Sequence, residues 1–386
     1  MTIKKPVFYF LLFILHVSFF TCLNSLVFAQ TNIPNEYPSL YKGARPLGMG
    51  NAFIAMEGID ENAIFYNPAA VNDYKKEFHF RLVSPLIDFS PGSIGLISDL
   101  FNLGDSIDAQ TTAAGKGDTF NNFVNQHAGE YESLDAQFMA LTMMHKWFAV
   151  SLLVDSRTTL SLRDSSSSNI QVNSRSDAGG VLSGAYGFFN DYLELGANLK
   201  ILYRLSVNNT VTTADVVSTS SFSNTLPRNS GIGVGFDLGV KGKIPTGNSS
   251  WLKALRTTVG ATWQDVGNTR FTGAAPNTPQ SVSAGLGFHP MIGSWELSIE
   301  NDFRQLNQSQ EFILKYNVGA EMLGPLMKKF FRPSFRVGGN QGYITGGLTM
   351  DFKYVRLDFA TYGEEVGQTT REGQNRRLVG NISFGI

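Results

Sequence analysis

Apolar and polar residues alternate one by one through most of the chain that follows residue 76. Between residues 193 and 203, Leu, Leu, Ala, Leu, Ile and Tyr take every second position, and the positions between them are mostly polar or glycine. The same period of two recurs at 232–241, 295–300 and 355–359. Because successive side chains of a strand point to opposite faces, this pattern predicts β-strands with two different faces. The apolar face points inward in a soluble sandwich and outward in a membrane barrel, and alternation alone does not choose between these two.

Strand length favours the barrel. A tilted strand needs about 9–11 residues to cross a bilayer, and we read about 14 segments of roughly 7 to 14 residues. Their spans are 77–87, 134–144, 147–157, 178–189, 192–205, 231–243, 254–264, 280–289, 293–303, 312–321, 333–340, 342–351, 353–361 and 376–386.

The connections between these segments are sorted by length. Five of the odd-numbered ones are long, at 88–133, 158–177, 206–230, 265–279 and 362–375, whereas most even-numbered ones are short. Outer-membrane barrels have long external loops and short periplasmic turns, a sorting that a soluble sandwich has no reason to show. The sequence therefore predicts an all-β protein, a transmembrane antiparallel β-barrel of about 14 strands, in the outer membrane of a diderm bacterium.

The N-terminus predicts export. Lys4 and Lys5 precede an almost wholly apolar run at 6–20, and Val-Phe-Ala at 27–29 forms a small-x-small cleavage site. This pattern predicts a cleavable signal peptide, residues 1–29, and favours it over an uncleaved membrane anchor. The only cysteine, Cys22, lies inside the predicted signal peptide, so the mature chain would carry no disulfide and no cysteine metal site.

Composition excludes other classes. The mean hydropathy is -0.06, which is too low for a membrane bundle of helices, and no segment beyond the N-terminal one is apolar for about 18 consecutive residues. The formal net charge of -1 gives no reason to expect nucleic acid as a partner.

A compact motif precedes the first predicted strand. It reads GARPLGMGNAFIAM from residue 43 and DENAIFYNPAAV from residue 60. Three glycines in eight residues permit tight backbone turns. Asn67-Pro68 predicts a turn or the start of a helix, with Asn67 placed to cap it. The segment is too short to form its own core, so we expect it to pack inside the barrel.

This motif resembles the FadL-like outer-membrane β-barrel superfamily, and more closely its PorV/PorQ-like and TraF-like uncharacterised branches. The run at 362–367, followed by Arg376-Arg377, resembles the last loop of those branches. The resemblance implies an N-terminal hatch (residues 30–76) that plugs a fourteen-stranded barrel (residues 77–386). The terminal aromatic residue that the barrel assembly machinery usually recognises is replaced by Ile386. The matching hatch residues are Gly48, Gly50, Ala52, Asn62, Ala63, Tyr66, Asn67, Pro68 and Ala69.

The resemblance implies passive uptake of a hydrophobic solute, such as a long-chain fatty acid, through a hatch-gated lumen. The alternative is a non-enzymatic secretion shuttle or anchor of the PorV type, which would bind a secretion-system protein. A general diffusion porin ranks third, because the hatch would obstruct it. The expected partners are thus outer-membrane lipid, the assembly machinery, and either a hydrophobic small molecule or a secreted protein.

The first long loop carries apolar residues at helical spacing. Ile97, Leu100, Phe101 and Leu103, together with Ile94, predict an amphipathic helix, and the phenylalanines at 120 and 123 predict a second short one. Such a helix on the outer lip could capture apolar molecules, or it could simply be packed as a lid.

No residue pattern points to catalysis. The five histidines are not spaced as metal ligands, and no nucleophile elbow or phosphate loop occurs. We therefore expect no enzyme activity, no cofactor and no metal. The charged residues predicted to face inward are mixed in sign, as expected of cross-strand pairs in a lumen. They are Glu194, Asp237, Glu296, Glu300, Asp302 and Asp358 with Lys200, Arg204, Lys241, Lys315, Arg336 and Arg356.

Overall fold

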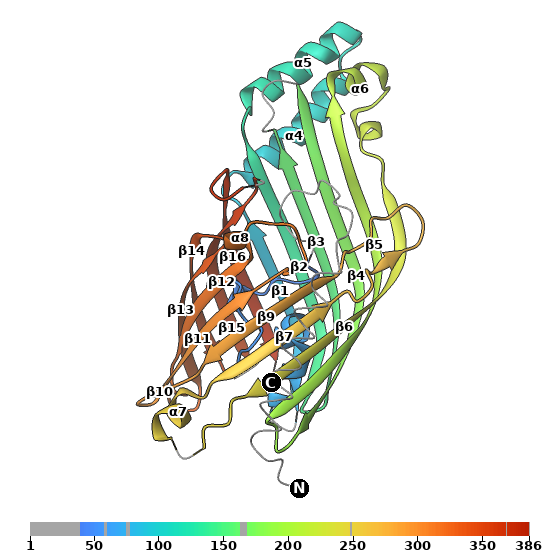
Figure 1. Cartoon of the computed structure of the whole chain (residues 1–386). Helices are drawn as coiled ribbons and strands as arrows, with labels where there is room; N and C mark the ends of the chain where they lie inside the picture. Colours follow the sequence, from blue (N-terminus) through green and yellow to red (C-terminus); the bar gives the residue numbers. More distant parts are fainter. Residues whose placement is uncertain are drawn as a thin grey trace.

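The structure, a computed structural model, describes residues 39–57, 60–74, 78–162, 168–247, 249–367 and 369–385. The predicted signal peptide and its cleavage site lie outside the described residues. Within these residues, sixteen strands form one antiparallel sheet, and fourteen of them close into a barrel because the first pairs with the last (Figure 1). The other two, β8 (Arg270–Phe271) and β10 (Met291–Ile292), are short and pair with β6 and β11.

The barrel strands follow one another in chain order around the ring. They are β1 (His79–Phe89), β2 (Tyr131–His145), β3 (Phe148–Ser161), β4 (Asn169–Phe188), β5 (Leu193–Thr212), β6 (Asn229–Lys243), β7 (Thr258–Gln264), β9 (Ser281–Phe288), β11 (Trp295–Phe303), β12 (Tyr316–Leu323), β13 (Phe331–Asn340), β14 (Tyr343–Phe352), β15 (Val355–Glu365) and β16 (Gln374–Gly385). Each overlaps one predicted span, so the predicted fold class is confirmed.

The alternation places apolar side chains outside and polar ones inside. Leu182 and Ile201 are exposed on the outer face, whereas Asp177 and Arg204 are buried on the inner face of the same two strands. A closed barrel with an apolar outer band leaves no backbone group unpaired in lipid, as a membrane-spanning sheet requires. The chain is thus an outer-membrane β-barrel. Among the described helices, none is both long and apolar enough to cross a membrane.

The prediction of a loop at 158–177 is wrong. β3 and β4 continue through most of it, and only the residues between Ser161 and Asn169 connect them. The region is rich in Ser and Thr, and their hydroxyls pair across the strands. Ser156 lies 2.7 Å from Ser176 and Thr158 lies 3.0 Å from Ser174, measured between side-chain oxygens. Hydroxyl groups satisfied in this way are compatible with an extended sheet.

Two predicted strands also begin too early, because short helices precede them. The predicted strand at 254–264 begins at Thr258, after α7 (Ser250–Leu255). The predicted strand at 312–321 begins at Tyr316, after α8 (Phe312–Lys315).

One side of the barrel is much taller than the other. β4 and β5 each contain 20 residues, about twice the length needed to cross a bilayer. Their upper parts carry α4 (Ser93–Asp108), α5 (Ala113–Gln126), α6 (Thr213–Ser218) and the 3-10 turn η2 (Phe222–Thr225), at the end opposite α7 (Figure 1). The two helices predicted in the first loop are therefore confirmed, and this taller end carries the longer connections typical of the external side.

The helices α4–α6 cover the outward face of this extension. Leu160 pairs with Val172, and Ile170 pairs with Val211. By alternation these residues share the face of the exposed Ile201, which points away from the lumen. All four are buried in one apolar cluster with residues of α4–α6. The extension is thus a packed external dome.

The N-terminal segment, defined here as residues 39–57 and 60–74, lies inside the barrel. It contains α2 (Ala44–Gly48), α3 (Ala63–Tyr66) and the 3-10 turn η1 (Pro68–Asp73). α2 contacts β13–β16, whereas η1 contacts β4–β6 on the other side of the ring. Nearly all of its residues are buried, so the segment fills the lumen at the level that it occupies.

Candidate functional site

Two motif glycines lie where the N-terminal segment approaches the barrel backbone closely. A Cβ on Gly48 would stand 3.0 Å from Gly347 Cα. A Cβ on Gly50 would stand 2.4 Å from the carbonyl oxygens of Gly339 and Val318. Gly50 also has a φ of 67°, a left-handed conformation that favours glycine. The glycine pattern therefore permits direct backbone contact with β12–β14.

Asn67 ties the two halves of the segment to β6. It is fully buried, and its Oδ1 accepts the N–H of Ala69 at 3.1 Å, while Pro68 takes the first position of η1. Its Nδ2 donates to the carbonyl oxygens of Ile54 at 2.8 Å and Val240 at 3.2 Å. The predicted helix start with an Asn cap is confirmed, and the same side chain also anchors the segment to the wall.

The other polar motif residues hold the internal shape of the segment. The Nδ2 of Asn62 donates to Asp60 Oδ1 at 2.7 Å, and the Tyr66 hydroxyl donates to Asn51 Oδ1 at 2.6 Å. Ala63 is buried between them on α3. These contacts fold the segment upon itself.

Arg45 is a buried electrostatic link between the segment and the barrel. Its guanidinium lies 3.1 Å from Asp60 and 2.5 Å from Glu321 of β12. Arg336 binds the same Glu321 at 3.0 Å, and Arg356 binds the same Asp60 at 2.8 Å. All five side chains are buried, so the segment is held by a shared network of charges.

A barrel carboxylate also binds the backbone of the segment. Asp302 of β11 accepts the N–H groups of Phe53 at 2.6 Å and Ile54 at 3.0 Å. The Thr258 hydroxyl donates to the carbonyl oxygen of Ala55 at 2.6 Å. Alternation predicts that Asp302 faces inward. No sequence signal identifies its partner, because backbone N–H groups are common to all residues except proline.

Further charges in the lumen form ion pairs between neighbouring strands and loops. Lys200 lies 2.7 Å from Asp237 and 2.6 Å from Asp265, and Arg204 binds Asp177 at 2.7 Å. The prediction of paired lumen charges of both signs is confirmed for residues such as Lys200, Asp237 and Arg204, whereas, among the described residues, Glu300 has no hydrogen-bond partner for its carboxylate oxygens and Lys315 binds backbone carbonyl oxygens. Within the described ranges, no three His, Cys, Asp or Glu side chains form a group that could hold a metal ion.

A turn outside the membrane-spanning strands fixes the end of the segment. Asn72 donates to Asp191, in the turn between β4 and β5, at 3.0 Å, and Lys146 lies 3.0 Å from the same carboxylate. The hydrogen bond from Asn72, together with Lys146, lowers the pKa of Asp191 despite partial burial.

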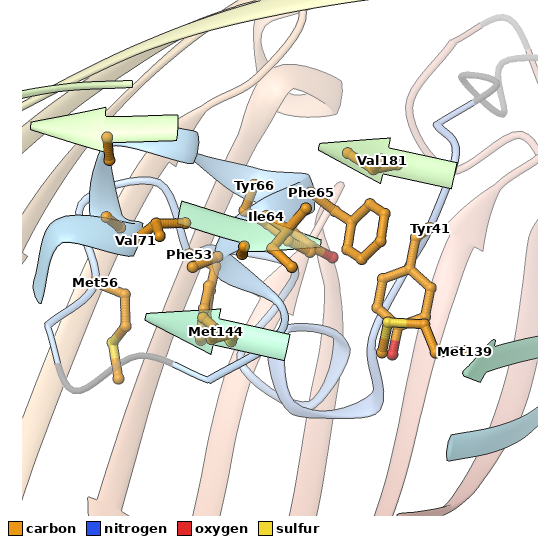
Figure 2. Packing of buried hydrophobic residues seen from close by; sticks show 14 of the residues in the cluster. Tyr41, Phe53, Met56, Ile64, Phe65, Tyr66, Val71, Met139, Met144 and Val181 are labelled. Carbon is orange, nitrogen blue, oxygen red and sulfur yellow. The ribbon is translucent and has the colours of Figure 1, made fainter. Parts of the chain in front are cut away.

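An apolar stripe runs along the lumen face of β2–β4. It is formed by Met139, Met144, Leu153 and Val181, and side chains of the N-terminal segment cover it (Figure 2). The covering apolar side chains are Tyr41, Phe53, Met56, Ile64, Phe65, Tyr66 and Val71. The two sides of the segment therefore differ, because one meets apolar side chains and the other meets charges.

The residues predicted to capture apolar molecules lie on α4 of the external dome. Leu103 is buried in the dome cluster, and Ile97 and Leu100 pack against it. Phe101 is 74% exposed. The structure thus separates the four residues into three that stabilise the dome and one that faces solvent, and a capture role stays a prediction.

A polar pocket lies between the N-terminal segment and the external ends of β11–β15. Among the residues that line it are Lys42 and Asn51 from the segment, with Arg304, Asn340 and Glu364 from the barrel. Sequence reasoning missed this pocket. Arg304 and the amide side chains lie at strand ends, where alternation no longer indicates which way a side chain points.

Comparisons with known proteins find similarity of fold only. No protein-family model and no curated protein matches the sequence. The CymD monoaromatic hydrocarbon channel is 12% identical, over 90% of this chain and 98% of its own, with a TM-score of 0.49. The Pseudomonas putida toluene transporter TodX is 11% identical, over 89% and 97%, with a TM-score of 0.49. A Pseudomonas aeruginosa FadL homologue is 12% identical, over 88% and 96%, with a TM-score of 0.42.

Proposed function

We propose that this barrel transports hydrophobic compounds across the outer membrane, with the N-terminal segment acting as a movable hatch. The observation that carries this proposal is the apolar stripe of Met139, Met144, Leu153 and Val181 on the lumen face. A water-filled channel has a polar interior. Here the N-terminal segment, which is not part of the barrel sheet, covers an apolar stripe inside the lumen. Once the segment moves, this stripe provides a surface that a hydrophobic solute can follow.

The attachment of the segment supports movement as a unit. It is bound through side-chain and backbone hydrogen bonds such as those of Asn67 and Asp302, and through the ion pairs of Arg45. These contacts break without unpairing any strand of the barrel. Two states that differ only in the docking of the segment meet the physical requirement for a gate.

The transport proposal is tested by measuring entry of a radiolabelled hydrophobic compound, naphthalene, into diderm host cells that express the chain. We expect faster entry than in cells without the chain, and no matching gain for a polar solute of similar size. Leu153→Gln should lower this selectivity, because Leu153 lies on the stripe. Leu152→Gln is the matched control, because Leu152 is 47% exposed on the opposite face. Equal naphthalene entry with and without the chain would overturn the proposal.

The dome favours a second candidate, a shuttle or anchor for a secreted protein. A strand crosses the bilayer with about 9–11 residues, whereas β4 and β5 have 20 each and carry three helices beyond the bilayer. Such an external structure offers a surface to a protein partner. Deletion of residues 93–126 should abolish retention of a secreted protein under this candidate, but should leave naphthalene entry unchanged.

A further inference from the structure

The turn between β12 and β13 has an unusual tip. The N–H of Phe330 donates to the carbonyl oxygen of Met327 at 3.0 Å, which closes a turn of four residues. Its two central residues, Lys328 and Lys329, have φ values of 48° and 58°. Both values match a type I′ turn, in which Asn-Gly is the preferred central pair. Lysine is unfavourable in this left-handed conformation because its Cβ crowds the following carbonyl oxygen, so the presence of two lysines here calls for a functional reason.

Exposed apolar side chains flank the two lysines. They belong to Leu326, Met327 and Phe330. The Phe330 ring lies 5.6 Å from the ring of Phe352 at the end of β14, measured between centroids, and Phe335 is exposed on the outer face of β13. β12 contains only 8 residues, whereas a tilted strand crosses a bilayer with about 9–11. The flanking side chains therefore continue the lipid-facing band of the barrel toward the periplasm, on a side where the strand is short.

The turn is cationic and faces the periplasm. The end of β12 pairs with the start of β11, so the turn lies beside β10, at the end of the barrel opposite the external dome (Figure 1). A third exposed lysine, Lys353, lies in the next turn, which the pairing of Phe331 with Phe352 brings alongside. Residues 324–330 and 353–354 include no Asp or Glu. No carboxylate of the described residues forms an ion pair with these three lysines, so their charges are available to an anion outside the chain.

We propose that this basic turn, residues 326–330 together with Lys353, binds the anionic headgroup of a phospholipid in the periplasmic leaflet. Lysine side chains lie along apolar surface while their ammonium groups reach the polar boundary. The apolar side chains of the turn contact the acyl chains, and the ammonium groups contact the phosphate. Continuity with the lipid-facing band favours a lipid over an acidic protein as the partner. The proposal does not depend on what the lumen transports.

Native mass spectrometry of the full mature chain in a neutral detergent tests this proposal. The probes are dioleoylphosphatidylglycerol, which is anionic, and dioleoylphosphatidylcholine, which has the same acyl chains and no net charge. A lysine near a membrane surface strengthens attraction to anionic lipid by a factor of about five. Lys328→Asn combined with Lys329→Gly introduces the preferred pair of the turn and so preserves the hairpin. This variant should bind the anionic lipid about 25-fold more weakly than wild type, with unchanged binding of the neutral lipid.

Two controls separate charge at this turn from other effects. Lys328→Arg combined with Lys329→Arg keeps both charges and should keep the preference for the anionic lipid. Lys116→Gln removes a lysine from α5 of the external dome and should leave that preference unchanged. Equal affinity of wild type for the two lipids, or a preference that persists after Lys328→Asn with Lys329→Gly, would overturn the proposal and favour an acidic protein as the partner. Inorganic phosphate that displaces the anionic lipid at equal concentration would also overturn it, because the ligand would then be free phosphate.

Discussion

Removal of the Arg45 guanidinium should release the N-terminal segment from the barrel wall. Arg45 lies between two buried carboxylates, Asp60 and Glu321. Loss of one partner of a buried pair costs about 3–5 kcal/mol, because a charge is left without compensation. Arg356 still binds Asp60 and Arg336 still binds Glu321, so the lower limit of about 3 kcal/mol is the appropriate magnitude for Arg45→Ala. This free energy corresponds to a rise of roughly a hundredfold in the undocked population.

Thiol labelling measures this population directly. The only cysteine of the chain lies at position 22, inside the predicted signal peptide, so a single Ala63→Cys substitution reports on a buried site of α3. We expect maleimide to label this thiol roughly a hundredfold faster in the Arg45→Ala background. Arg332→Ala is the control, because Arg332 binds the barrel carbonyl oxygen of Gly324. If the Arg45→Ala protein is labelled at a rate within twofold of the Ala63→Cys protein that keeps Arg45, the role of this network in docking is refuted.

Three further predictions follow from the same contacts. Gly50→Ala should lower the yield of the heat-modifiable folded barrel on gels, because the added Cβ would enter the space of two carbonyl oxygens. Gly267→Ala is the control and should lower this yield less, because Gly267 has a similar φ of 74° but no atom within 4 Å of the added Cβ. Equal losses of yield would show that only the backbone conformation matters. Asn67→Asp keeps the cap acceptor but loses both donations to carbonyl oxygens, so it should accelerate thiol labelling of the segment, by about tenfold for each lost hydrogen bond at most; an unchanged rate would contradict this. Because the pKa of Asp191 is lowered in the folded state, the contribution of Asp191 to stability is present above the ordinary Asp pKa and is lost as the pH falls through the lowered value. Protease cleavage of the segment should therefore rise on acidification less steeply in Asp191→Asn than in wild type. Parallel pH profiles of the two proteins would count against this role of Asp191.

Strand number and facing were predictable because the physics behind them is local. Leu182 and Ile201 point outward and Asp177 points inward for one reason, the period of two in a strand. The extension of β3 and β4 through 158–177 was not predicted, because the hydroxyls of Ser174 and Ser176 find their partners on another strand, and sequence neighbours do not show whether such a partner exists.

The candidate site was predictable only in part, for a related physical reason. Gly50 and Asn67 carry information in their residue type, since few other residues adopt a positive φ or cap a helix in this way. Asp302 binds backbone N–H groups about 250 residues away in sequence, and Glu321 binds Arg45 from the opposite end of the chain. Such features depend on the whole lumen and are seen only when the chain is folded.

Single-channel conductance tests the central claim most directly. The claim is that the N-terminal segment closes a lumen that would otherwise be open. In planar bilayers, the full mature chain should remain closed, with brief openings at most, whereas a chain that lacks residues 31–70 should show a stable open conductance while still running as a folded barrel on gels. Equal conductance of the two proteins would contradict the account, because the segment would then not close the lumen.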